Sequence, residues 1–229
     1  MLSADAYRGG MAAARVTLVG LLALVVAALT VTFGALVALD TTVRDWLIER
    51  RSPALTAVLT GFTTVGSSAV LVSLAFGITV WLAVTRRRGE ALLVAGTTAG
   101  ALLLGPLLKN IVERARPGGG HLVLVNSWAY PSGHSLTSTA VIGVLAVLMS
   151  RSFRARAARA AVGLGAVVLI VGVGVSRVYL GVHWPTDVLA GWLVGALWLA
   201  VCLWAYERFA PSAADPAQQR KSQDAERPE

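Results

Sequence analysis

Long apolar runs alternate with short polar segments along most of the chain. Because a helix needs about 20 consecutive apolar residues to cross a bilayer, each run is a candidate membrane span. The pattern predicts an all-α integral membrane bundle of six transmembrane helices, with both termini on one side of the membrane. The runs lie at about residues 16–39, 53–85, 91–112, 133–150, 160–175 and 185–206.

The ends of the chain define the expected domain. The first run is too long for the apolar core of a signal peptide, which has roughly 7–15 residues, so we interpret it as an anchor. We expect residues 1–15 to form a cytoplasmic N-terminus and residues 16–208 to form one six-span domain. Residues 209–229 are polar and are predicted to be a disordered cytoplasmic tail. Segment 40–52 mixes charged with apolar residues, which is typical of a short interfacial helix.

The composition supports a membrane protein and excludes a nucleic-acid-binding one. The chain is 56% hydrophobic and 14% charged, whereas soluble domains carry roughly 25% charged residues. Its net charge of +8 comes from short basic clusters between the apolar runs, as expected of loops between spans. Cys202 is the only cysteine, which excludes an intramolecular disulfide and a cysteine metal cluster.

The distribution of basic residues predicts the orientation. The segments on one side are the N-terminus, the loop near residue 87, the loop near residue 155 and the tail, and they hold 13 of the 20 basic residues. Because basic residues accumulate in cytoplasmic loops, we expect both termini to be cytoplasmic. The loops that begin after residues 112 and 175 then face outward.

Three polar segments meet at the outward face of this predicted bundle. One ends the third span, one begins the fourth, and one joins the fifth to the sixth. Their candidate functional residues are Lys109, Arg116, Ser132, Gly133, His134, Arg177, His183 and Asp187.

This set of residues suits a phosphoryl group. Arginine presents a planar fork of donors that matches phosphate oxygens, and lysine adds a point charge. Ser132 and Gly133 begin a predicted helix, where backbone N–H groups and the helix dipole favour an anion. One histidine can attack phosphorus while a second protonates the leaving oxygen.

Each residue alone has a simpler explanation. A single Lys109 or Arg116 is more often an interfacial anchor than a catalytic group. Ser132 with its neighbours is a turn and helix cap, Asp187 is a helix-start residue, and His134 is an ordinary interfacial histidine. These explanations do not account for all the residues at one face with these spacings.

The spacings resemble those of the type 2 phosphatidic acid phosphatase family, also called the PAP2 or lipid phosphate phosphatase family. Its first motif matches Lys109 to Arg116-Pro117, and its second matches Pro131-Ser132-Gly133-His134. Its third motif matches Ser176-Arg177 followed by His183 and Asp187. The three motifs together are specific, although each would be weak alone.

The resemblance implies a role for each motif residue. It implies that His183 is the nucleophile and forms a phosphohistidine, that Asp187 holds its imidazole, and that His134 is the general acid. The remaining residues are implied to cradle the phosphate: Lys109, Arg116, Ser132, Gly133 and Arg177. Neither a metal nor a cofactor is expected, since three cations already meet the phosphate. Glu113, Arg114 and His121 match variable or unmatched positions and are assigned no role.

Two other functions stay open at this point. Vanadium haloperoxidases are similar at the site, but they are larger soluble enzymes, which the six apparent spans disfavour. A lipid transporter would place its site near the bilayer midplane, whereas these charges lie at span ends. The expected partner is a lipid phosphate or diphosphate of the phosphatidate, phosphatidylglycerol phosphate or undecaprenyl diphosphate type. The motifs do not distinguish among these lipids, and the apolar spans do not indicate an oligomeric state.

Overall fold

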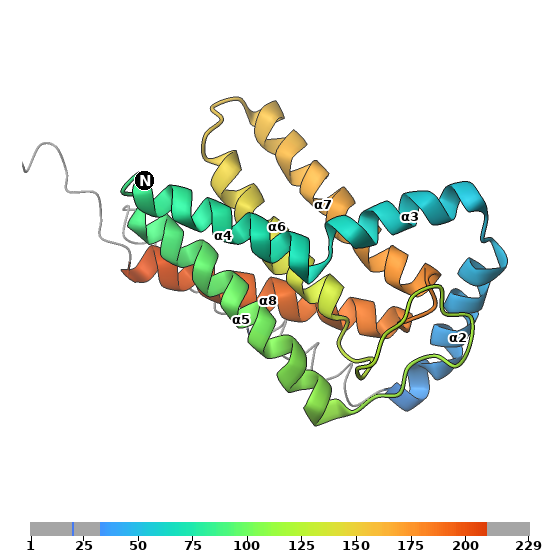
Figure 1. Cartoon of the computed structure of the whole chain (residues 1–229). Coiled ribbons are helices and arrows are strands. Elements are labelled where there is room, and N and C mark those ends of the chain that lie inside the picture. The colour runs from blue at the N-terminus through green and yellow to red at the C-terminus, as the bar shows by residue number, and fades with distance from the viewer. Residues whose placement is uncertain (1–19, 21–32, 210–229) are drawn as a thin grey trace, which may run out of the picture.

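The computed structural model describes residue 20 and residues 33–209, and this part of the chain is helical with connecting loops (Figure 1). The expected N-terminal segment 1–15 lies outside the described residues, as does the expected tail 209–229 except for Phe209, which ends α8. The helices are α2 (Phe33–Glu49), α3 (Pro53–Val65), α4 (Ser68–Val84), α5 (Arg88–Val112), α6 (Gly133–Ser150), α7 (Arg156–Tyr179) and α8 (Pro185–Phe209).

Four helices are long and apolar enough to cross a membrane: α5, α6, α7 and α8. They coincide with the third to sixth apolar runs of the sequence. A fifth candidate is the pair α3 and α4, which is bent by 43°. The described residues therefore contain four candidate membrane spans, or five if the bent pair is one span. The first predicted span, 16–39, lies mostly outside the described residues.

The second apolar run is a broken helix instead of the single straight span that its hydropathy suggests. Gly66 follows α3, and Ser67 caps α4 by accepting a hydrogen bond from the Val70 N–H at 3.4 Å. A Cβ on Gly66 would lie 2.4 Å from the Val173 side chain, so α7 packs directly against the break. Hydropathy cannot reveal this bend, because both halves are equally apolar.

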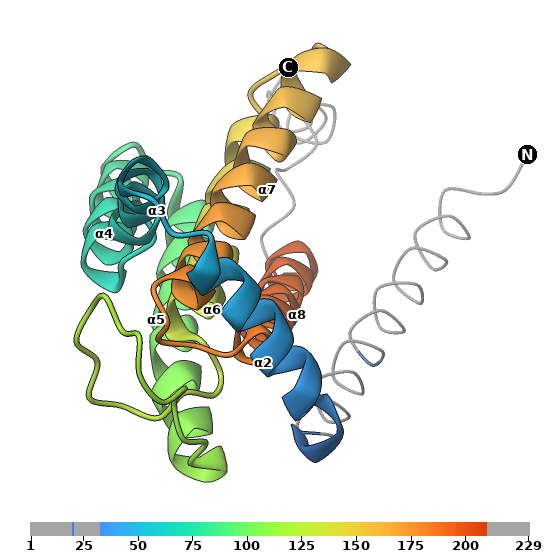
Figure 2. The same ribbon diagram turned by 90° about the vertical axis from the view of Figure 1, so that its right-hand side faces the viewer.

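Helix α2 does not end near Leu39, where the sequence predicts the end of a span. The sequence predicts a span to residue 39 and a separate interfacial helix over 40–52, but α2 is one helix across both segments. It lies across the ends of α7 and α8, as Figure 2 shows. This position buries Asp40 against the start of α8.

Helices α6 and α8 form the closest pair in the centre of the bundle. A Cβ on Gly191 would lie 2.7 Å from the Ser132 carbonyl oxygen, and one on Gly195 would lie 2.6 Å from that of Leu136. Small residues spaced four apart allow membrane helices to approach this closely. Apolar side chains of α5, α6 and α8 pack on either side of the contact, including Ala101, Leu136 and Val194.

The two connections that carry the motifs lie at the same end of the bundle. Residues 113–132 join α5 to α6, and residues 180–184 join α7 to α8 (Figure 1). The Leu122 N–H donates to the Leu180 carbonyl at 3.0 Å, which links the two loops. Gly181 has a φ of +82°, and a Cβ there would lie 2.5 Å from the Gly120 carbonyl oxygen. Only glycine fits this turn without strain.

Candidate active site

The start of α8 builds the core of the site. Pro185 is the first helical residue, where its missing N–H costs nothing, and Asp187 lies in the first turn. One oxygen of Asp187, Oδ2, accepts the Trp184 N–H at 2.9 Å and lies 3.3 Å from His183 Nδ1. Asp187 therefore both caps the helix and contacts the imidazole, as its four-residue spacing from His183 predicts.

The His183 ring is buried between Asp187 and Arg116. Its Nε2 lies 3.3 Å from Arg116 Nη1, on the opposite side of the ring from Asp187. Because a guanidinium only donates and a carboxylate only accepts, both contacts assign the proton to Nδ1 and the lone pair to Nε2. This is the tautomer that a nucleophilic Nε2 requires.

The surroundings of His183 keep it neutral. Burial is the largest cause that lowers its pKa well below 6.5, followed by the positive charges of Arg116, Arg177 and Lys109. A neutral imidazole keeps the Nε2 lone pair available at physiological pH.

Lys109 and Arg116 both face the loop that ends the α5–α6 connection. Lys109 donates to the Trp128 carbonyl. Arg116 donates to the Ser127 carbonyl at 2.6 Å, to the Trp128 carbonyl at 3.2 Å, and to the Val182 carbonyl. The donors of both cations thus converge on one small region. An incoming phosphate would share these donors with the carbonyl oxygens or replace the carbonyl oxygens as their acceptor.

The first turn of α6 lies beside these cations and against α8. Ser132 is the N-cap, and its own N–H donates to the Asp187 carbonyl at 2.9 Å. A Cβ on Gly133 would lie 4.0 Å from Lys109 Cε, which brings the first and second motifs together. His134 lies within range of charge interaction with Lys109, Arg116, Arg177 and His183. The structure therefore gathers all eight candidate residues around one region.

Arg177 approaches this region from the last turn of α7. Its guanidinium is buried, and Nη1 donates to Thr63 Oγ1 of α3 at 2.6 Å. Its buried Nε has no hydrogen-bond partner among the described residues. A buried N–H without a partner is costly, and an anion at the site would satisfy it.

The structure adds two residues that the sequence analysis missed, Asp40 and Arg114. Arg114 Nη1 lies 2.6 Å from Asp187 Oδ1, and Nη2 lies 2.6 Å from Asp40 Oδ2. Arg114 falls at a variable position of the first motif, and Asp40 lies 74 residues from Arg114 in the sequence, so neither was expected at the site. His121 is exposed and contacts the Pro117 carbonyl within its own loop.

A cavity of about 740 Å³ adjoins the cations. Lys109 and Arg116 line it, together with the polar side chains of Asn110, Asn126 and Ser127. It lies beside the C-terminal end of α5, where Ile111 is 68% exposed on the helix surface. A ligand in this cavity would touch both the cations and the apolar side chains that also line it, Pro106, Val125 and Trp128.

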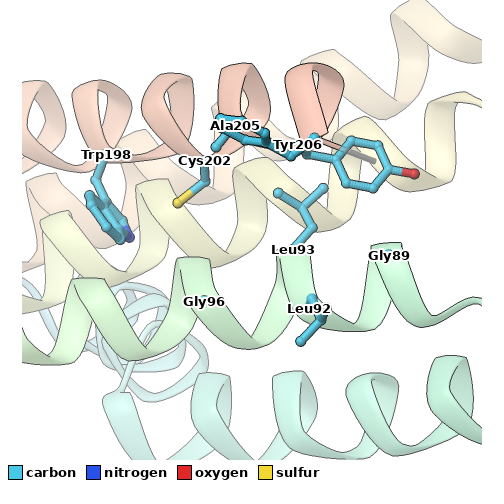
Figure 3. A pocket seen from close by; sticks show the side chains of 9 residues that line it. Gly89, Leu92, Leu93, Gly96, Trp198, Cys202, Ala205 and Tyr206 are labelled. Carbon is cyan, nitrogen blue, oxygen red and sulfur yellow. The ribbon is translucent and has the colours of Figure 1, made fainter. Parts of the chain in front are cut away.

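A second cavity of about 400 Å³ lies between α5 and α8 (Figure 3). It is lined by apolar side chains such as Leu92, Trp198 and Cys202, with Tyr206 at one end. Cys202 is about 19 residues from His183, which corresponds to roughly 28 Å along a helix. This cavity is therefore separate from the cluster of motif residues.

Comparison with known proteins agrees with the motif pattern. The PAP2 superfamily model matches residues 90–211. The chain is 36% identical over 149 residues to phosphatidylglycerophosphatase B of Bacillus subtilis, covering 64% of this chain and 73% of that protein. It is 33% identical over 127 residues to undecaprenyl-diphosphatase of Sulfolobus acidocaldarius, covering 51% and 53%.

The fold agrees as well. The crystal structure of a transmembrane PAP2-type phosphatidylglycerolphosphate phosphatase from Bacillus subtilis superposes with a TM-score of 0.78 at 31% identity. The superposition covers 84% of this chain and 98% of that one. The family expected from the three motifs is confirmed: this multi-pass membrane protein belongs to the PAP2 superfamily.

Proposed function

We propose that the protein is a membrane phosphatase that hydrolyses a lipid phosphate or diphosphate through a phosphohistidine at His183. The observation that carries this proposal is the pair of contacts on the His183 ring. Asp187 lies at Nδ1 and Arg116 lies at Nε2, each at 3.3 Å. The lone pair of Nε2 is thereby directed at the cations that would bind the phosphoryl group.

The residues support a two-step reaction. In the first step Nε2 of His183 attacks phosphorus, and the bond from phosphorus to the leaving oxygen breaks with its electron pair. His134, protonated beside the negatively charged phosphate, donates a proton to that oxygen and becomes neutral. In the second step a water molecule attacks phosphorus, His134 accepts a proton from it, and the N–P bond breaks. Inorganic phosphate leaves, and His183 returns to its neutral form.

The cations supply the electrostatic part of this mechanism. Lys109, Arg116 and Arg177 offset the charge that builds on the phosphoryl oxygens, and the N–H groups at the start of α6 add fixed dipoles. The unpartnered Nε of Arg177 is one donor that would be satisfied on binding. We propose no metal or cofactor for this reaction.

A lipid substrate is supported by the position of the cavity. The cations lie at helix ends, and the cavity adjoins the flank of α5. A head group could enter it while the tail stays in hydrocarbon. This avoids a cost of about 0.8 kcal/mol for each methylene that would otherwise be exposed to water. Relatives of the chain include phosphatidylglycerophosphatase B and undecaprenyl-diphosphatase, so both a monophosphate and a diphosphate are candidates.

We further propose that the site faces outward and that both termini are cytoplasmic. The loops at the end remote from the site include Arg86, Arg87, Arg88 and Arg151, and such clusters favour the cytoplasm. A substrate would then reach the site from the outer leaflet.

A comparison of substrates tests the proposal. The purified protein in mixed micelles is given long-chain phosphatidate, phosphatidylglycerol phosphate, undecaprenyl diphosphate and a short soluble phosphomonoester. We expect kcat/KM for at least one long-chain lipid to exceed that for the soluble ester by more than tenfold, and His183→Ala to abolish release. Equal values for lipid and soluble esters would overturn the lipid assignment. Activity that persists in His183→Ala would overturn the mechanism.

A further inference from the structure

A buried chain of charges connects α2 to the proposed nucleophile. Asp40 of α2 accepts the Thr186 N–H at 2.9 Å through Oδ1, and it faces Arg114 through Oδ2 at 2.6 Å. Arg114 faces Asp187 Oδ1 at 2.6 Å, and Asp187 Oδ2 contacts His183. Asp40 and Asp187 are each at most 1% exposed.

Arg114 is well suited to hold a carboxylate in one orientation. Its two terminal nitrogens face two different carboxylates, so the planar guanidinium fixes the direction of both. With Oδ1 of Asp187 on Arg114, its Oδ2 is left for His183 Nδ1 and the Trp184 N–H. A buried carboxylate also needs an opposite charge close by to stay ionised.

Asp40 completes this arrangement from the other side. It balances the charge of Arg114 and ties Arg114 to the first turn of α8 through Thr186, whose hydroxyl donates to Asp40 Oδ2 at 2.6 Å. Asp40 lies before residue 90, where the match to the family model begins. Helix α2, which lies outside the matched region, therefore helps to hold the site residues in place.

We propose that Arg114, held by Asp40, is a positioning residue that holds the Asp187 carboxylate turned toward His183 Nδ1, so that the lone pair stays on Nε2. This proposal rests on the proposed function, because it assigns Arg114 to the activation of the same nucleophile. In this role Arg114 acts through Asp187 and not by binding the phosphate.

The test is a double-mutant cycle between Arg114→Lys and Asp187→Asn, measured with a nitrophenyl phosphate ester and with a lipid phosphate. Lysine keeps the positive charge but cannot face both carboxylates with a planar fork. We expect Arg114→Lys to lower kcat about 10- to 100-fold, as for other residues that orient a functional ligand, with KM changed less than twofold. In the Asp187→Asn background the same change should lower kcat less than threefold.

Two further variants separate positioning from folding. Asp40→Asn should lower kcat in the same direction, and combining it with Arg114→Lys should add little. Arg44→Lys is the matched control, because Arg44 and Arg114 have side chains 11% and 12% exposed and both lie within 6 Å of the Trp184 ring centroid. Arg44 contacts the Gly118 and Gly119 carbonyls instead of Asp187. We expect its substitution to change kcat less than threefold.

The outcomes are distinct. Equal losses from Arg114→Lys in the wild-type and Asp187→Asn backgrounds would overturn the positioning role, as would a rise in KM without a fall in kcat. Equal losses in Arg44→Lys and Arg114→Lys, accompanied by equal falls in the thermal unfolding midpoint, would mean a purely structural role and would also overturn it. Failure of the proposed function is recognised separately, by activity that persists in His183→Ala.

Discussion

Nε2 of His183 and Nη1 of Arg116 lie 3.3 Å apart, so the proposed nucleophilic atom directly faces a cation that would bind its target. The same guanidinium therefore has two effects. It attracts the phosphoryl oxygens, and it disfavours protonation of the imidazole that must attack the phosphorus atom. The effect on imidazole protonation can be separated from the attraction of the phosphate by measuring activity as a function of pH.

The acid limb of kcat/KM should lie below pH 6.5. Burial and the charge of Arg116 lower the pKa of His183, so the imidazole stays neutral until the pH falls below that lowered pKa. Activity is then retained above this value and lost as the pH falls through it. In Arg116→Gln the pKa should rise, and the acid limb should move to higher pH. A phosphate monoester itself titrates near pH 6, so the two enzymes are compared on one substrate. An unchanged limb would contradict the charge effect.

His134 should matter most when the leaving group is poor. A lipid alcohol needs a proton as it departs, whereas nitrophenolate barely needs one. We expect His134→Ala to lower kcat by about 10²- to 10⁴-fold on a lipid phosphate, the usual range for a general acid, and by much less on a nitrophenyl ester. Steady-state rates on the two substrates provide the measurement. Equal losses on both would argue against the general-acid role.

Activity should be independent of divalent metal ions. Lys109, Arg116 and Arg177 already supply positive charge to the phosphate, so a metal ion would be redundant. We expect full activity in excess EDTA and inhibition by vanadate, which takes the phosphate position. Loss of activity in EDTA that Mg²⁺ restores would contradict this prediction.

Thiol labelling should report the orientation. After Cys202 is replaced, single cysteines are introduced within 118–126 and within 152–155, and intact cells are treated with a membrane-impermeant thiol reagent. We expect labelling in the first segment only, since the basic clusters predict that the second is cytoplasmic. Labelling of the second segment alone would reverse the proposed topology.

The contact between α6 and α8 should be sensitive to a single methyl group. A Cβ on Gly191 would meet the Ser132 carbonyl at 2.7 Å, and backbone atoms cannot rotate away. Gly191→Ala should destabilise the protein by about 1–3 kcal/mol through overpacking. A misplacement of about 1 Å at the site can also lower activity as much as 10²-fold. Gly163→Ala is the control, because a Cβ there meets nothing within 4 Å. Equal thermal midpoints and activities in both variants would contradict the prediction.

The sequence predicts the helices whose boundaries coincide with changes in polarity. The runs at 91–112 and 133–150 correspond to α5 and α6, because charged residues or a capping serine mark their ends. The bend at Gly66 also has a capping serine, Ser67, but apolar residues continue beyond it on both sides, so the hydropathy pattern predicts one run. The continuous helix α2 was missed because Asp40 looked like the polar end of a span, whereas its charge is compensated by a residue far along the chain.

The motif spacing likewise predicts which residues gather at the site, but not how they are held. The four-residue step from His183 to Asp187 predicts their contact directly. The bridge from Asp187 through Arg114 to Asp40 joins three separate parts of the chain, and no local spacing encodes it. The Ser127 and Trp128 carbonyls that receive Lys109 and Arg116 belong to an irregular loop and carry no side-chain signal.

Gly191 and Gly195 of α8 also determine which changes in its surroundings the site can tolerate without losing its geometry. His134 lies in the first turn of α6 and His183 lies just before α8, so the distance between the proposed acid and nucleophile depends on where these helices touch. At that contact a Cβ on Gly191 would meet the Ser132 carbonyl oxygen, the Ser135 Cβ and the Leu136 nitrogen, none of which can move by a change of rotamer. Thinning of the bilayer or warming can rearrange the long side chains on the lipid-facing surface. The distance between the two histidines is then expected to stay constant, because the contact that sets it is made by main-chain atoms and short side chains of α6 packed on the two glycines.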